Sequence, residues 1–347
     1  MNPLVDKYIR YIDTVRRYSG KTCDNYVEVL EEFVGYSLEN PDDAEALPAS
    51  LTPTSIRNYE VHLLEDRKLG SRTVNLHLSV LSGFCRFLML EGLLKSNPVR
   101  LVTRPKTEKR LPVFYRDDSM DEYYADTDYA VSTDSLDLLR SICSSGSGDT
   151  IARELYERRL RRMIVSLLHS CGIRRAELAS LDVQSVDFGR NMLKVRGKGD
   201  KMREVPLVET VVEELKLYLK AADIFFAAFP ADLSEVISAD GAGGPSAGAP
   251  LLRTPSGRRL YPVFIDRAVK RELSGVSGIT GRKSPHVLRH TITTELLNDG
   301  SDINSIKELL GHSSLAATQV YTHNSIEKLR AVYDRAHPRA KDPSSSD

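Results

Sequence analysis

SPHVLRHTITTELLNDGSDINSIKELLGHSSLAATQVYTH, residues 284–323, is the stretch from which the rest of the chain can be interpreted. Its first half carries apolar residues at helical spacing, among them Ile292 and Leu296, and predicts a helix. The segment SDINSIKELLG predicts a second helix, which begins at Asp302 and ends at Gly311. Two short helices therefore hold the polar residues of this stretch close together in sequence.

Those polar residues are cations and a phenol, namely His286, Arg289, His290, His312 and Tyr321. Arginine offers a planar fork of donors, histidine donates and can move a proton, and tyrosine can serve as a nucleophile. Such a group suits a phosphate. A single His or Tyr at a helix edge is more often structural, so the interpretation depends on the combination.

Length and composition indicate an ordinary globular protein with room for two domains. The chain has 347 residues, 41% of them hydrophobic and 28% charged. No apolar run of transmembrane length and no signal-peptide pattern is seen, so we expect a cytoplasmic protein without a membrane partner. The four cysteines form no CxxC pair, which favours reduced thiols over a metal site.

The formal net charge of zero conceals a segregation of charge along the chain. Residues 71–110 are rich in Arg and Lys, whereas residues 115–150 are rich in Asp and Glu. A local basic stretch is compatible with a nucleic-acid partner even when the total is neutral. Within the acidic stretch near 117–137, the segment RDDSMDEYYADTDY (116–129) is expected to form either a surface loop repelled by DNA or a patch for a partner protein, and residues 132–145 predict a short helix.

Four amphipathic helices are predicted in the first hundred residues, at 4–18, 19–40, 54–70 and 71–94. They would form a compact bundle, which on pattern alone could be a protein-interaction module. The following residues 99–113 contain two prolines and several basic residues without an apolar period, and are expected to be a linker.

The second half of the chain is expected to be mainly helical with one small sheet. Residues 150–170 predict a long helix whose second half, MIVSLL, is apolar all round and hence buried. Residues 185–207 alternate apolar and polar positions around two turns, which predicts three antiparallel strands. The Gly/Ala-rich residues 239–250 predict a flexible loop.

The sequences HVLRH, LGHSSLAATQVYTH, GIRRAEL and GKGDKMREVPL resemble the motifs of the tyrosine recombinase (phage integrase) family, in particular its Xer-like members. The resemblance implies a helical core-binding domain at 1–98, a linker at 99–113, a catalytic domain at 114–335 and a flexible tail at 336–347. The implied fold class is mainly α with a small antiparallel β-sheet. The implied catalytic residues are Arg174, Lys198, His286, Arg289, His312 and Tyr321.

The resemblance also assigns a role to each of these side chains. Arg174, oriented by Glu177, would clamp the nonbridging phosphate oxygens together with Arg289, and His312 would add a donor. Tyr321 would attack to give a 3′ phosphotyrosine link, Lys198 would protonate the leaving 5′ oxygen, and His286 would act on the tyrosine proton. His290 is expected to support the helix or Arg289 rather than to react directly. No metal, cofactor or ATP is expected.

The implied partner is double-stranded DNA with a specific recombination site, bound by a homo- or heterotetramer of recombinase protomers. The DNA-contacting residues are expected to be Arg72, Arg86, Lys95, Arg104 and Arg258, and Arg259 is a further candidate. The expected activity is DNA strand exchange, with chromosome-dimer resolution as its role. The alternatives are a phage or mobile-element integrase/excisionase, a 3′ linking topoisomerase and a non-catalytic DNA-binding regulator. Sequence leaves the target site and any activator open.

Overall fold

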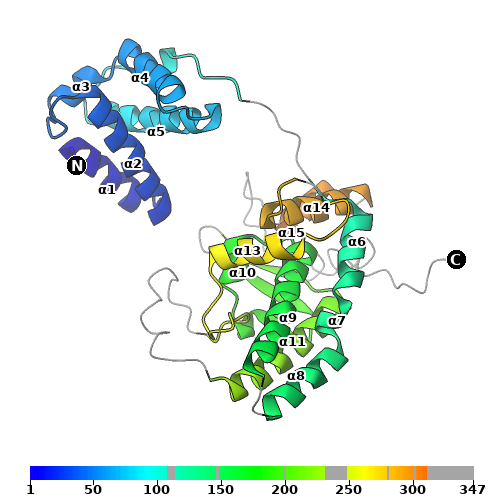
Figure 1. Cartoon of the computed structure of the whole chain (residues 1–347). Coiled ribbons are helices and arrows are strands. Elements are labelled where there is room, and N and C mark those ends of the chain that lie inside the picture. Colours follow the sequence, from blue (N-terminus) through cyan, green and yellow to red (C-terminus); the bar gives the residue numbers. More distant parts are fainter. Residues whose placement is uncertain are drawn as a thin grey trace. The chain divides into compact units, whose positions relative to one another are not determined.

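The computed structural model describes residues 1–107, 114–145, 148–197, 201–230, 248–279, 281–299 and 302–310. Two compact units are present, an N-terminal unit (Met1–Arg110) and a C-terminal unit (Leu111–Asp347). Figure 1 shows the elements of both. The division between the units falls inside the stretch 99–113 that was predicted to be a linker.

The N-terminal unit is a helical bundle (Figure 1). Its helices are α1 (Pro3–Thr14), α2 (Gly20–Ser37), α3 (Ala46–Ser50), α4 (Pro53–Glu65) and α5 (Ser71–Leu90), followed by the 3₁₀ helix η1 (Pro98–Leu101). Side-chain oxygens of Asn2, Ser19 and Thr52 cap α1, α2 and α4. The four predicted helices are present, and α3 is an additional short one.

Two details of this unit differ from the sequence interpretation. Helix α4 ends at Glu65, several residues before Gly70, and Gly70 is the N-cap of α5 in place of Ser71. Val99 and Val102 are buried in the core of the unit, so its folded part extends into the stretch that was predicted to be a linker.

Helix α5 is the one element among the described residues that is long and apolar enough to cross a membrane. Several of its apolar side chains, including Leu78, Leu81 and Phe84, are fully buried in the core of the bundle, whereas Leu76, Met89 and Leu90 are exposed. The central helix of a soluble bundle meets the same length and composition criteria, and half of the apolar window is buried inside the protein.

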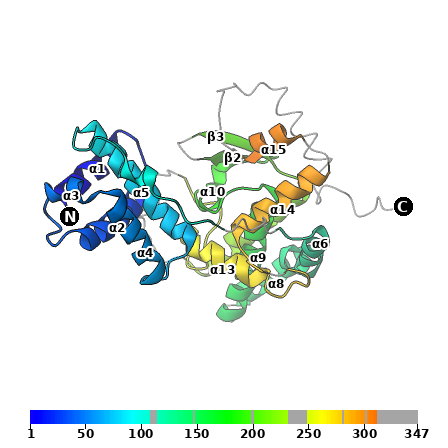
Figure 2. The ribbon, with the colours of Figure 1, turned by 90° about the horizontal axis from the view of Figure 1, so that it is seen from above.

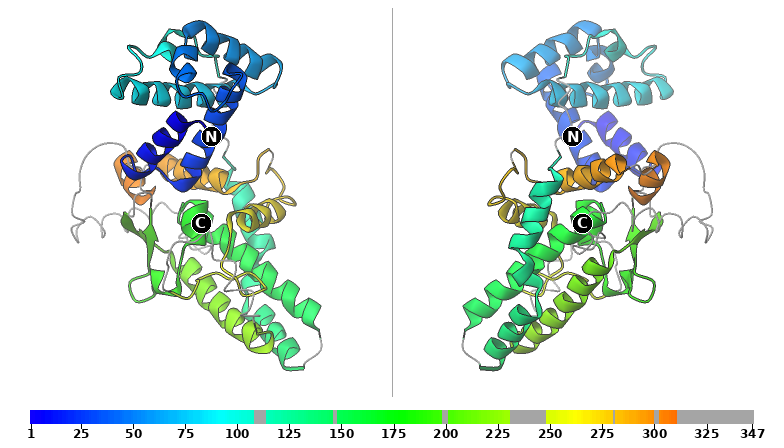
Figure 3. Two further views of the ribbon diagram at one scale, coloured as in Figure 1. Left: turned by 90° about the vertical axis from the view of Figure 1, so that its left-hand side faces the viewer. Right: turned by 90° about the vertical axis from the view of Figure 1, so that its right-hand side faces the viewer.

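The C-terminal unit has a helical core around α9 (Asp149–Ser170). Helices α8 (Thr133–Ser145) and α11 (Glu209–Ala228) pack against α9, as do α13 (Pro262–Glu272) and α14 (Pro285–Asn298). Figure 3 shows α11 beside α9 and α8. The segment MIVSLL (163–168) in the second half of α9 is completely buried, as its apolar sequence predicts.

The predicted acidic loop is instead helical. Residues 117–137 form α6 (Asp117–Asp126), α7 (Asp128–Val131) and the start of α8. Met120 and Tyr123 are almost completely buried in the core, because the acidic residues alternate with apolar ones at helical spacing. The surface-loop alternative for residues 116–129 is therefore wrong, because the aromatic face of this segment is buried, whereas α8 agrees with the helix predicted at 132–145.

A three-stranded antiparallel sheet lies next to α10 (Arg175–Ala179) and α15 (Ile303–Leu310), as Figure 2 shows. Its strands are β1 (Val186–Asp187), β2 (Met192–Arg196) and β3 (Met202–Pro206), in the order β1-β2-β3. Val195 on β2 pairs with Arg203 on β3. The sheet confirms the predicted fold class, mainly α with a small antiparallel sheet.

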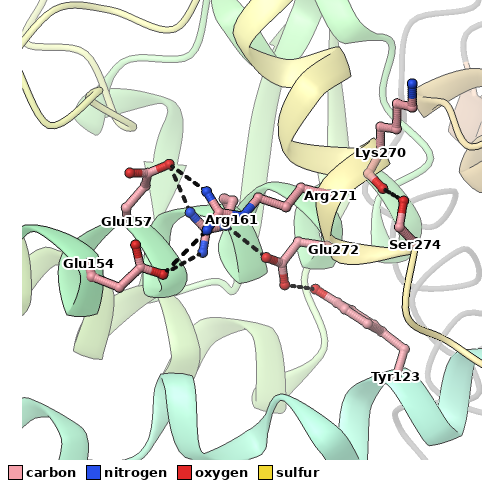
Figure 4. Close-up of polar contacts among 8 residues, drawn as sticks. All are labelled: Tyr123, Glu154, Glu157, Arg161, Lys270, Arg271, Glu272 and Ser274. Atoms are coloured by element: carbon pink, nitrogen blue, oxygen red, sulfur yellow. Dashed lines mark hydrogen bonds and ion pairs between the residues drawn. The ribbon is translucent and has the colours of Figure 1, made fainter.

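A charged cluster attaches α13 to α9 (Figure 4). The guanidinium of Arg161, 5% exposed, lies 2.8 Å from Glu157 Oε1 and 2.8 Å from Glu272 Oε1. Tyr123 donates to the second oxygen of Glu272 at 3.3 Å, which brings α6 into the same cluster. Because each buried charge has a partner, the cluster holds the three helices together without an uncompensated charge.

Gly172, which follows α9, occupies a conformation that predicts a strong effect of substitution. Its φ is +57°, and an added Cβ would lie 2.6 Å from Leu310 Cδ2. We expect Gly172→Ala to lower the free energy of unfolding by about 1–3 kcal/mol through backbone strain and overpacking. Urea unfolding of the purified protein measures this. Gly275→Ala is the control, because a Cβ there meets nothing within 4 Å, and equal stability of both variants would contradict the prediction.

Candidate active site

Arg174 is positioned at the beginning of α10, where it is the N-cap residue. Its guanidinium donates to Glu177 Oε1 at 2.8 Å, and its backbone N–H donates to Glu177 Oε2, also at 2.8 Å. The contact with Glu177 is the one that the spacing in GIRRAEL predicts. With its side chain 35% exposed, Arg174 can present donors to solvent or to a bound phosphate.

Glu177 is a buried carboxylate, 4% exposed, that accepts from two arginines. Arg203 on β3 binds it side-on, with Nη1 3.0 Å from Oε1 and Nη2 2.8 Å from Oε2. Burial alone would raise the pKa of Glu177, but the hydrogen bonds from Arg203 and Arg174 outweigh it and lower the pKa to about 2. Glu177 therefore stays ionised and holds Arg174 over the whole physiological pH range.

Arg289 lies on α14 and is 7% exposed. Its guanidinium donates to the carbonyls of Gly172 and Leu310, the latter at 2.7 Å. Burial and the nearby charge of Arg174 lower the pKa of Arg289 to about 10, so it remains a cation at neutral pH. The fold thus brings Arg174 and Arg289, separated by more than a hundred residues, into one site.

Two histidines of α14 are exposed, one turn apart. Burial and the positive charges of Arg175 and Arg282 lower the pKa of His286, which favours its neutral form at pH 7. A neutral imidazole can accept a proton, as the role expected of His286 requires. Arg289 itself is held by the backbone carbonyls of Gly172 and Leu310, and the supporting role expected of His290 stays a prediction.

The three other candidate residues, Lys198, His312 and Tyr321, lie outside the described residues. The flanks of two of them are described. Gly197 donates its N–H to the carbonyl of Lys201 at 2.8 Å, at the base of the β2–β3 hairpin. Helix α15 ends at Leu310, two positions before His312. Gly197 lies beside Glu177, the partner of Arg174. Leu310 lies beside Arg289, which donates to its carbonyl.

Three of the predicted DNA-contacting residues lie along the polar side of α5 or against it. Arg72 and Arg86 are exposed, and their positions share one helix face with Asn75, Ser79 and Ser82. Arg104 donates to Ser79 Oγ at 2.8 Å, which places its guanidinium on the same face. The N-terminal unit therefore has a basic surface on α5, and Lys95 is exposed shortly after the end of that helix.

The two arginines that follow the β-turn at 254–257, Arg258 and Arg259, differ in their surroundings. Arg258 is half-buried, and its carbonyl accepts from Thr254 N at 2.8 Å. Arg259 lies 2.5 Å from Asp182 Oδ1 and also donates to the carbonyls of Leu181 and Gly248. Arg259 thus joins the segment at 181–182 to Gly248, and it is less suited than Arg258 to contact DNA.

The basic surface of α5 predicts the salt dependence of DNA binding. We expect Arg72→Gln and Arg86→Gln each to weaken binding and to reduce the slope of log K against log salt by about 0.9, the value for one lost phosphate contact. Fluorescence anisotropy with a duplex at several salt concentrations measures this. Arg67→Gln is the control, because Arg67 is already paired with Glu32 at 2.5 Å. An unchanged slope in both variants would contradict the assignment.

Among the residues that the structure describes, no group of three or more His, Cys, Asp or Glu side chains could hold a metal ion. The described cysteines are free, and three of the four are buried. The chemistry that the described site offers is therefore that of fixed guanidinium donors, together with a neutral imidazole.

The fold and the site together define a class: a helical unit with a basic surface, joined to a helical unit in which two guanidiniums converge. The sequence profile "Phage integrase family" matches residues 150–328, and the profile "Phage integrase, N-terminal SAM-like domain" matches residues 5–92. The chain belongs to the phage integrase family, the tyrosine recombinases, and it is an enzyme of DNA strand exchange.

Curated relatives match over nearly the whole chain. Tyrosine recombinase XerC of Chlorobaculum parvum is 32% identical over 97% of this chain and 94% of its own. Tyrosine recombinase XerC of Bacillus subtilis is 30% identical over 97% of this chain and 96% of its own.

Among solved structures, a lambda integrase (75–356) dimer bound to a COC′ core site has a TM-score of 0.55. Its sequence is 17% identical, and the match covers 92% of this chain and 98% of that one. At this identity the likeness supports the fold alone.

Proposed function

We propose that this chain is a site-specific recombinase that resolves chromosome dimers. The supporting observation is its similarity, along nearly the full length, to relatives named tyrosine recombinase XerC. The convergence of Arg174 and Arg289 supplies the chemical reason, because a phosphodiester undergoing exchange needs fixed positive donors for its nonbridging oxygens.

In the proposed mechanism, Tyr321 attacks the scissile phosphate and forms a 3′ phosphotyrosine bond, while the 5′ oxygen leaves. Lys198 protonates that oxygen, and His286 accepts the proton of the tyrosine. Arg174, Arg289 and His312 neutralise the nonbridging oxygens as charge develops. The covalent link conserves the energy of the broken bond, so the 5′ hydroxyl of another strand can reverse the step without ATP or metal.

The proposed partners follow from the same assignment. Double-stranded DNA would contact Arg72, Arg86, Lys95, Arg104 and Arg258. The chain would consist of a core-binding domain at 1–98 and a catalytic domain at 114–335, joined by the linker 99–113. Four protomers, identical or of two kinds, would assemble on two sites in the cytoplasm. The tail 336–347 would remain outside the catalytic domain.

A supercoiled plasmid with two direct copies of a candidate chromosomal site tests this function. We expect the protein to convert the plasmid into two smaller circles. If the tetramer contains two kinds of protomer, the second recombinase is added to the reaction. Conversion only when the two sites differ in sequence would favour an integrase of a mobile element. Relaxation of a plasmid that lacks the site would favour a topoisomerase.

A further inference from the structure

Arg203 is a buried side chain whose contacts extend beyond its own strand. It is 7% exposed, and its two terminal nitrogens bind the two oxygens of Glu177. Its third donor, Nε, points to the C-terminal end of α15, where it donates to the carbonyl of Leu309 at 3.1 Å. One planar guanidinium therefore connects the sheet, the carboxylate that orients Arg174, and the last turn of α15.

The last turn of α15 is held by two cations at once. Arg203 binds the carbonyl of Leu309, and Arg289 binds the carbonyl of the next residue, Leu310. Terminal carbonyls of a helix have no partner inside the helix and carry partial negative charge, so guanidinium donors stabilise them. His312 follows Leu310 by two positions in the sequence, and the two arginines fix the last described turn before it.

The base of the β2–β3 hairpin lies against the same guanidinium. A Cβ on Gly197 would lie 3.5 Å from Arg203 Nη1 and 3.8 Å from Glu177 Oε1. Gly197 directly precedes Lys198. Arg203 therefore also lies against the last described residue before Lys198.

We propose that Arg203 is a positioning residue for DNA cleavage, which holds Arg174 through Glu177 and fixes the departure points of the segments that carry Lys198 and His312. It does not touch the reacting phosphate. This inference rests on the proposed function, because the segments it positions are those assigned to catalysis. A shift of about 1 Å in a catalytic group reduces rates by as much as about a hundredfold, so loss of Arg203 affects the chemical step before it affects DNA binding.

The test is single-turnover cleavage of a nicked duplex by the full-length protein and by Arg203→Gln, with Arg190→Gln as the matched control. Arg190 belongs to the same sheet region, but its pair with Glu204, at 3.2 Å, is exposed. We expect Arg203→Gln to form the covalent adduct at least about tenfold more slowly, with noncovalent DNA affinity within about twofold of the parent. Arg190→Gln should cleave like the parent.

The dependence on pH separates positioning from a general loss of structure. The charged groups that face Glu177 are Arg174 and Arg203, with Arg289 nearby. Without Arg203, burial raises the pKa of Glu177, so that Glu177 takes up a proton as the pH falls and then releases Arg174. The rate ratio of Arg203→Gln to parent should therefore fall further between pH 7.5 and pH 5.5.

Three results bear on the proposal. Cleavage by Arg203→Gln at the parental rate at both pH values would overturn it, and so would a rate loss that only matches the unfolded fraction measured by circular dichroism. If Arg203→Gln does not fold, Arg203→Lys keeps the charge without the fork, and parental cleavage by that variant would equally overturn it. Failure of the parent protein to form an adduct would count against the proposed function. Failure of the proposed function and failure of the proposal on Arg203 therefore give different results.

Discussion

We expect Tyr321→Phe to abolish the covalent adduct between protein and DNA. The variant loses one oxygen atom, which is the nucleophile of the proposed mechanism. Incubation with a nicked duplex followed by a denaturing gel measures the adduct. The nick allows the released fragment to diffuse away, so that the adduct accumulates.

Binding must be followed in the same experiment. Tyr321→Phe should bind the duplex as tightly as the parent, because a phenol contributes no charge to the phosphate contacts that dominate affinity. Tyr261→Phe is a suitable control, since Tyr261 is a half-exposed tyrosine at the start of α13. An adduct that persists in Tyr321→Phe would contradict the assignment. Complete function in this variant would support the non-catalytic regulator.

Arg289→Lys is expected to have the second largest effect, a loss of about 10²–10³-fold in the cleavage rate constant. A lysine is a point charge without the planar fork, so it cannot bind the carbonyls of Gly172 and Leu310 and also present donors to a phosphate. Charge is retained, so DNA affinity should change little. Single-turnover cleavage beside anisotropy titrations separates the two quantities.

The matched control for this substitution is Arg140→Lys. Arg140 is an exposed residue of α8 that is paired with Asp137 at 2.8 Å, and it should tolerate lysine. If Arg289→Lys cleaved DNA at the parental rate, the bidentate role of Arg289 would be wrong. A reduction in stability alone would appear as a shift in the urea midpoint, which must be reported beside the rate.

Much of the fold could be predicted because it follows from periodicity and local signals. The helices of the N-terminal unit, the buried helix α9 and the three-stranded sheet all correspond to apolar patterns with a period of 3.6 or 2 residues. Helix α15 begins where Asp302 predicts it, and its carboxylate accepts from Ser305 N at 3.1 Å. Boundaries were less accurate, as the early end of α4 illustrates.

The acidic segment shows why one sequence feature can mislead. Its net charge allowed either a loop or a partner patch, but Tyr123 and Tyr124 give α6 a buried face that packs around Arg162. The guanidinium of Arg162 lies 4.4 Å from the centre of the Tyr124 ring and 2.8 Å from Glu214 Oε1. Met120 with Tyr123 and Tyr124, three and four positions later, was the signal that could have predicted this helix.

The candidate site was only partly accessible from sequence. The contact between Arg174 and Glu177 could be predicted because the two residues lie three positions apart. The contacts of Arg203 could not, since they join β3 to Glu177 and to the end of α15, more than a hundred residues away. Arg203 stands in the motif GKGDKMREVPL, where the sequence drew attention to Lys198 alone.

The most direct test of this account is identification of the amino acid and the DNA end that are joined in the covalent adduct. The adduct, formed in the presence of EDTA, can be digested with protease and nuclease and its peptide sequenced by mass spectrometry. The account predicts a nucleotide attached through its 3′ phosphate to Tyr321. Attachment to another residue, or to a 5′ phosphate, would contradict it.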